Sequence, residues 1–111
     1  MTSHESDRVH EFFSGSSRDV TPAPVSQFVR VLFAPISRDP DATRLCASVL
    51  SETELQRADR FAAGEDGDEF KQRRAFRRYC GAVALGFSQP LLEIVFSETD
   101  YGWPYICLLY T

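Results

Sequence analysis

A helix-start signature at Ser51 and Glu54 is the feature that most constrains how this chain can fold. Ser51 is a residue type that caps helices, and Glu54 follows three positions later, as in a capping box in which each residue satisfies a backbone donor of the other. Leu55, Ala58 and Phe61 then recur every three residues and mark one narrow apolar face. The pattern predicts a short helix that packs through this face.

A longer helix is predicted directly after the first. Gly64 separates the two, and the acidic run 65–69 suits a helix start because negative charge complements the helix dipole there. From Phe70 to about Gly86 the pattern is helical. Its inward stripe is expected to comprise Gln72, Phe76, Tyr79, Cys80, Val83 and Phe87.

Arginines flank both helices. Arg57 and Arg60 lie beside the apolar face of the first helix, on a side that must meet solvent or an anion. Four more flank the stripe of the second helix, namely Arg73, Arg74, Arg77 and Arg78. Like charges spaced i, i+4 destabilise a helix by about a few tenths of a kcal/mol per pair. A solvated basic face is the commoner explanation of such a run, and contact with an anion is the alternative.

Short apolar runs on either side of the helices predict strands. The alternation at 28–33 is typical of a half-buried strand, and a short helix is expected over 42–50. Two further runs at 93–97 and 104–110 are separated by turn-forming residues at 100–102. The predicted fold is α+β, with helices packed on a small, mostly antiparallel sheet.

The N-terminal residues 1–26 are polar, and we expect them to form a disordered tail before a single domain over 27–111. The net charge of −4 gives no reason to expect nucleic acid as a partner. No apolar run approaches the length of a membrane helix, and residues 1–20 lack the apolar core of a signal peptide. We therefore expect a cytoplasmic protein with no membrane partner.

The cysteines do not indicate a metal site. Cys46, Cys80 and Cys107 are widely spaced and form no CxxC motif, while His4 and His10 both lie in the polar N-terminal segment. Reduced, mostly buried thiols are the expected state.

The order of these motifs resembles the 4′-phosphopantetheinyl transferase superfamily, in its two-lobed, surfactin-synthetase-activating type. The resemblance covers Val29 to about Ile106, and its specificity comes from order and spacing. It depends on four segments: LSxxExxRAxRF at 50–61, FxxxRxxxR at 70–78, IxF at 94–96 and YGxPY at 101–105.

The resemblance implies an enzyme that moves the phosphopantetheine arm of coenzyme A to a serine of an acyl or peptidyl carrier protein. Proteins of this family have two similar lobes with coenzyme A and a magnesium ion between them. This chain resembles the N-terminal lobe only, and the family's D-x-E metal ligands do not occur before Thr111. We therefore expect this chain to be inactive alone, either as a truncated or frameshifted gene product or as a genuine half.

The resemblance also assigns roles to individual arginines. Arg57 stands where relatives use a basic residue to bind the phosphates of coenzyme A, and the alternative is an exposed ion pair with Glu54. Arg74 and Arg78 stand at the two arginines of the family's long helix. Arg74 is a second candidate contact to coenzyme A, although for both arginines we favour a structural role, packing or pairing with the turn before Tyr101.

The last part of the chain departs from the family. Trp103 stands where relatives have a phosphate-contacting lysine; it could stack on an adenine ring, or the sequence has drifted here. Ile106, Leu108 and Tyr110 would lie on an edge strand without a second lobe to cover it, which predicts self-association.

Three functional hypotheses therefore stand together. The first is a phosphopantetheinyl transferase lobe. The second is a non-enzymatic module that binds coenzyme A or a carrier protein. The third is a small α+β interaction domain that uses the 73–78 face to bind an acidic partner.

Overall fold

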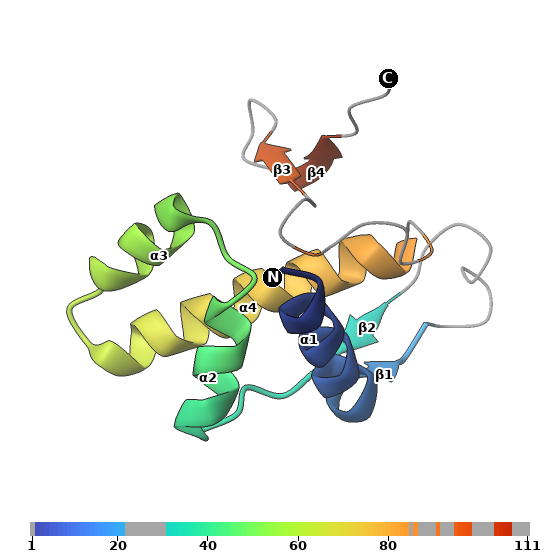
Figure 1. Cartoon of the computed structure of the whole chain (residues 1–111), viewed down its shortest axis with the longest axis horizontal. Coiled ribbons are helices and arrows are strands. Elements are labelled where there is room, and N and C mark those ends of the chain that lie inside the picture. Colours follow the sequence, from blue (N-terminus) through green and yellow to red (C-terminus); the bar gives the residue numbers. More distant parts are fainter. Residues whose placement is uncertain are drawn as a thin grey trace.

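One long helix forms the centre of the molecule. The structure, a computed structural model, describes residues 2–21, 31–84, 86, 91, 95–98 and 104–107. Helix α4 spans Gly64–Ala84, and each of the other three helices packs against it (Figure 1). Ala75 and Ala82 of α4 are fully buried, and Phe76, Tyr79 and Val83 of the expected stripe lie at or near the core beside them, whereas Phe87 lies outside the described residues. The predicted long helix is confirmed; it begins at Gly64, directly before the acidic run 65–69, and ends at Ala84, two residues before the expected end.

Helix α3 begins at the capping box that the sequence predicts, and the short helix expected over 42–50 is present two residues earlier at its start and three residues earlier at its end. Helix α2 spans Pro40–Ala47; the Asp39 side chain caps it and its proline occupies the first turn, where no backbone donor is needed. Helix α3 spans Glu52–Asp59, and both hydrogen bonds of the capping box are present. The Ser51 backbone N–H donates to Glu54 Oε1 at 2.9 Å, and the Glu54 backbone N–H donates to Ser51 Oγ at 3.2 Å.

The N-terminal segment is helical, so the prediction of a disordered tail is wrong for Thr2–Ser16. These residues form helix α1, which lies against α4 and α2 (Figure 1). Val9 and Phe13, four residues apart on one face, are 0% and 3% exposed. The Phe13 ring contacts the rings of Phe76 and Tyr79, at centroid distances of 5.2 and 5.4 Å. Burial of this apolar face stabilises α1 as an ordered helix, although most of its residues are polar.

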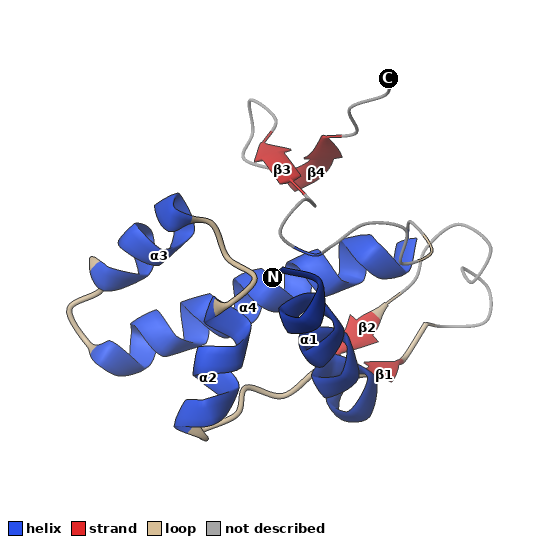
Figure 2. Cartoon of the chain, in the orientation of Figure 1, coloured by secondary structure: helices blue, strands red, loops and turns tan. Residues whose placement is uncertain are grey.

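The strands form two small antiparallel sheets (Figure 2). Strand β1 (Arg18–Asp19) pairs with β2 (Leu32–Phe33), and β3 (Val95–Glu98) pairs with β4 (Pro104–Cys107). The second pair confirms the two strands expected at the C-terminal end. The strand expected over 28–33 is present at its last two residues, and 28–30 lie outside the described residues.

The α+β class is confirmed, but the described helices pack on one another more than on a sheet. The fully buried side chains come from α1, α2, α4 and the segments beside them, and the largest are Leu91, Val9, Val49 and Cys46. Because α1 joins the core, it covers a face of α4 that a sheet would otherwise need to cover. No helix in the described part of the chain is long and apolar enough to cross a membrane.

Candidate functional site

The two candidate arginines come together where α3 packs against the first half of α4. Ala58 is the buried residue of α3, and it faces Gly67 of α4. A Cβ atom at Gly67 would lie 2.8 Å from the Ala58 carbonyl oxygen, closer than side chains tolerate. Glycine is therefore required at this position for the two helices to approach as closely as they do.

Phe70 is the shared contact of both arginines. The guanidinium carbon of Arg57, from α3, lies 5.5 Å from the centre of the Phe70 ring. That of Arg74, from α4, lies 5.0 Å from the same centre. Both distances allow a cation–π interaction, which orients a planar guanidinium group over the ring. Arg57 and Arg74 belong to two separate motifs of the sequence, and the structure brings them together.

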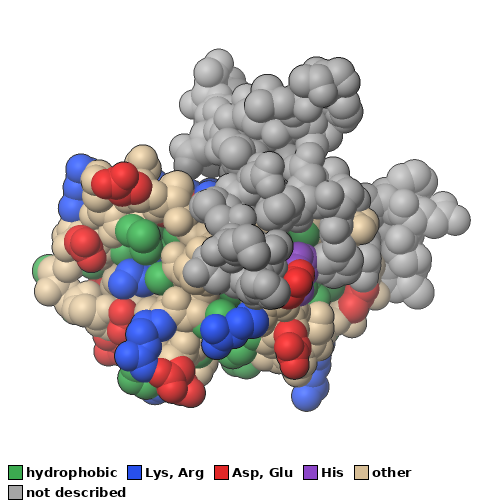
Figure 3. Space-filling model, viewed as in Figure 1, with side chains coloured by type: hydrophobic (Ala, Val, Ile, Leu, Met, Phe, Trp, Pro, Cys, Tyr) green, Lys and Arg blue, Asp and Glu red, His purple; other side chains and the backbone are tan. Residues whose placement is uncertain are grey.

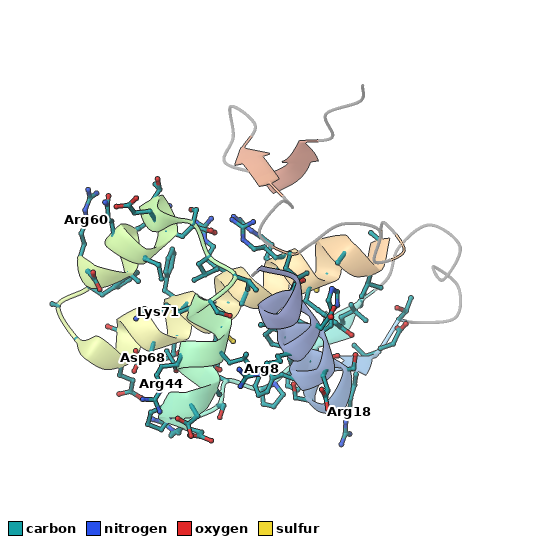
Figure 4. All side chains as sticks on the ribbon, viewed as in Figure 1. Arg8, Arg18, Arg44, Arg60, Asp68 and Lys71 are labelled. Atoms are coloured by element: carbon teal, nitrogen blue, oxygen red, sulfur yellow. The ribbon has the colours of Figure 1, made fainter. Side chains whose placement is uncertain are left out.

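An open depression of about 440 Å³ adjoins this contact and is lined by Arg57, Arg60 and Phe61. The Phe61 ring is 38% exposed and lies 5.5 Å from the Phe70 ring. Figure 4 shows Arg60 extending from the end of α3 away from the body of the molecule. We name Arg57, Arg60, Phe61, Phe70 and Arg74 the arginine–phenylalanine patch.

The patch is a local feature of an acidic protein. On the face shown in Figure 3, acidic and basic side chains alternate over the part of the surface formed by α2, α3 and α4. Arg57 and Arg60 make no ion pair with any acidic side chain in the described part of the chain. Anions that approach Arg57 and Arg60 therefore meet two guanidinium groups that no described carboxylate neutralises.

The remaining arginines do not form the continuous basic face of the third hypothesis. Arg73 is exposed and pairs with Glu69 at 3.6 Å, one turn earlier on α4. The Arg78 side chain is only 8% exposed and points into the molecule. A partner that docked on α4 would meet Arg73 but could not reach Arg78.

Arg78 forms a buried ion pair with Glu54, and this pair replaces the one considered between Arg57 and Glu54. Arg78 Nη2 donates to Glu54 Oε1, and Arg78 Nη1 donates to the Leu91 carbonyl oxygen at 3.1 Å. Burial tends to raise the pKa of Glu54, but hydrogen bonds from Ser51 and the charge and hydrogen bond of Arg78 outweigh it, so the pKa is lowered. The structural role favoured for Arg78 is thus observed, while the turn before Tyr101 lies outside the described residues.

Other candidates contribute no reactive group among the described residues. Trp103 lies outside them, so its stacking role stays a prediction. Burial raises the pKa of the Cys46 thiol to about 12 and that of Cys80 to about 11, which keeps both protonated and unreactive at neutral pH. No group of three or more His, Cys, Asp or Glu side chains in the described part of the chain could hold a metal ion. The magnesium ion that the resemblance implies therefore has no ligand set among these residues.

A second groove lies on the other side of the start of α4 and is acidic. Its volume is about 370 Å³, and it is lined by Ile36, Ser37, Arg38, Pro40, Thr43, Glu65, Asp68, Glu69 and Gln72. The Arg38–Glu65 ion pair, 2.6 Å long, lies at this groove, and Gln72 is satisfied by hydrogen bonds to Ser37 and Thr43. An anion is better accommodated at the arginine–phenylalanine patch.

Phe70 is the central residue that the sequence analysis did not assign to the site. It precedes Arg74 by four positions on the same helix, so the two side chains share a face. The four-residue spacing could therefore have predicted the contact between Phe70 and Arg74. The contact between Phe70 and Arg57 could not be predicted from sequence, because it depends on how α3 and α4 pack.

Comparison with known proteins gives no match: no family model, curated protein or solved structure corresponds to this chain.

Proposed function

We propose that this chain is the N-terminal lobe of a phosphopantetheinyl transferase and that its arginine–phenylalanine patch contributes phosphate contacts for coenzyme A. One observation carries the proposal. Arg57 and Arg74 were selected from two separate motifs, and their guanidinium groups lie over one phenylalanine ring. Two residues that bind one ligand must lie near each other, and these two do.

The chemistry of the patch suits a phosphorylated ligand with more than one anionic group. Guanidinium groups donate paired hydrogen bonds to phosphate oxygens in a fixed planar geometry. Stacking on Phe70 limits the rotamers of both arginines, so less conformational entropy is lost when they bind an anion. Arg60 lines the depression together with Arg57 and adds a further cation beside the stack on Phe70.

In the proposed reaction, a carrier-protein serine attacks the β-phosphoryl group of coenzyme A and releases 3′,5′-ADP. Such a phosphoryl transfer needs neutralisation of charge on the pyrophosphate and a correctly positioned donor. The residues described here would position the nucleotide end of coenzyme A and balance part of its charge. The carrier protein is the expected macromolecular partner, and its serine supplies the attacking hydroxyl group.

Titration calorimetry with coenzyme A tests the proposal. We expect Arg57→Ala and Arg74→Ala each to weaken binding roughly tenfold, because each removes a charge-assisted contact to a phosphate. The matched control is Arg44→Ala, which removes an exposed arginine from α2 that pairs with Asp41. Pantetheine, which has no phosphate, should not bind.

Two results would contradict the proposal in different ways. If the unmodified chain does not bind coenzyme A, the proposed function is wrong. If it binds but Arg57→Ala, Arg74→Ala and Arg44→Ala behave alike, coenzyme A binds elsewhere.

Intact-mass analysis of an apo-carrier protein separates a transferase from a non-enzymatic binding module. The carrier is incubated with this chain, coenzyme A and magnesium, and a phosphopantetheine adduct is sought. We expect no mass gain from this chain alone, because the resemblance places the magnesium ligands in the second lobe. The binding-module hypothesis is favoured if this chain binds coenzyme A and a longer chain that includes a second lobe also leaves the carrier protein unmodified.

A further inference from the structure

Arg78 connects three segments that are distant in sequence. It extends from α4, pairs with Glu54 on α3 and donates to the carbonyl oxygen of Leu91 beyond the end of α4. The N–H of Leu91 in turn donates to Ser6 Oγ of α1 at 3.0 Å. A single buried guanidinium group thus takes part in placing α3 and the segment at Leu91 on α4.

Each residue of the Glu54–Arg78 ion pair lies one helical turn from an arginine of the arginine–phenylalanine patch. Glu54 lies one helical turn before Arg57 on α3, and Arg78 lies one turn after Arg74 on α4. At the other end, α3 meets α4 through the close approach of Ala58 and Gly67. The two helices are therefore fixed at two points near the stack on Phe70.

We propose that Arg78 is a positioning residue which, through Glu54, sets the register of α3 on α4 and so holds Arg57 over Phe70 beside Arg74. Its effect on coenzyme A rests on the proposed function, whereas its effect on Arg57 does not. Arg74 serves as an internal reference, because it shares a helix with Phe70 and needs no help from α3 to reach the ring.

The chemistry of a buried ion pair favours a positioning role over a purely stabilising one. Removing two charges from water costs several kcal/mol, and well-packed apolar residues of similar size often stabilise a fold as well or better. An ion pair with additional hydrogen bonds, however, accepts only a narrow range of geometries. Arg78 uses one nitrogen for Glu54 and another for Leu91, so neither α3 nor the Leu91 segment can slide without breaking a bond.

The test measures the position of Arg57 without any ligand. Side-chain protons held over an aromatic ring show an upfield ring-current shift in NMR spectra, and Phe70→Leu provides the reference without the ring. The positioning variants are Arg78→Lys, which keeps the charge but loses the planar fork, and Glu54→Gln, which keeps an acceptor for the Ser51 N–H. The matched control is Gln72→Leu, a buried polar change on α4 whose lost hydrogen bonds lead to Ser37 and Thr43 rather than to α3.

All spectra are recorded at a low temperature at which circular dichroism is first used to establish that each variant is folded. We expect Arg78→Lys and Glu54→Gln to lose most of the upfield shift of Arg57 and to keep that of Arg74. Gln72→Leu should keep both. The inference is overturned if both positioning variants keep the Arg57 shift, or if Gln72→Leu loses it equally.

Coenzyme A affinity is the second measurement on the same proteins. Arg78→Lys and Glu54→Gln should bind roughly tenfold more weakly, as Arg57→Ala does, because each removes Arg57 from its place. Full affinity in both variants despite a lost Arg57 shift would overturn the link between the register and the ligand. If the unmodified chain fails to bind coenzyme A, the proposed function fails, while the ring-current result still decides the role of Arg78.

Discussion

Replacement of Phe13 by alanine tests whether α1 is an integral part of the fold. Phe13 is 3% exposed and its ring contacts those of Phe12, Phe76 and Tyr79. A phenylalanine side chain buries about 150–250 Å², which corresponds to roughly 4–6 kcal/mol at 25 cal/mol per Å². Alanine retains its methyl group and the neighbours relax in part, so we expect Phe13→Ala to lower the free energy of unfolding by about 3–5 kcal/mol.

Urea unfolding followed by far-ultraviolet circular dichroism measures this loss. With a slope of about 1–3 kcal/mol per M for a small domain, the midpoint should fall by roughly 2 M. Glu11→Ala is the matched control, since it alters an exposed residue of the same helix. If Phe13→Ala and Glu11→Ala differ by less than about 0.5 kcal/mol, α1 does not contribute to the core and the assignment of this helix to the domain is wrong.

Two further predictions concern the contact between α3 and α4. Gly67→Ala should destabilise the fold, because its Cβ would lie 2.8 Å from the Ala58 carbonyl oxygen; Gly15→Ala, with open space around it, should be neutral or stabilising in thermal unfolding. The lowered pKa of Glu54 means that its stabilising contribution is present above its ordinary value of 4.5 and is lost as pH falls through the lower folded value. The difference in unfolding free energy between the unmodified chain and Glu54→Gln should therefore shrink below pH 4.5, and a constant difference would contradict this.

The helix starts were predictable because their signals are local. The cap of α3 needs only Ser51 and Glu54, three residues apart, and the start of α4 needs only the acidic run 65–69 after Gly64. Neither depends on what the rest of the chain does. The antiparallel pair at the C-terminal end was predictable for the same reason, since two apolar runs flank a turn.

Helix α1 was not predicted, because the polar composition of residues 2–16 was given more weight than the spacing of their few apolar side chains. Its residues are mostly polar, but Val9 and Phe13 are four apart and Phe12 adds to the same side. A short apolar stripe of this kind gains its energy only when a complementary surface exists. That surface is formed by residues of α2 and α4, far along the chain.

In the candidate site, too, features set by local spacing could be predicted and those set by tertiary packing could not. Arg57 and Glu54 are three apart on one helix, so an exposed pair between them was a reasonable alternative from sequence. In the structure Glu54 turns instead to Arg78, 24 residues away. Arg74 and Arg78 are chemically identical and one turn apart on α4, yet Arg74 lies over Phe70 and Arg78 is buried against Glu54 and Leu91. Tertiary packing distinguishes their positions, and the local sequence does not.

The hydrogen bond between Ser6 and Leu91 has a consequence for the order of events during synthesis. The two residues are 85 positions apart, so α1 emerges from the ribosome long before one of its binding partners exists. At about 5–20 residues per second, roughly 4 to 17 seconds separate their synthesis. During that interval the apolar side of α1 has an incomplete docking surface, and the earliest folded form of the nascent chain must be organised without Leu91.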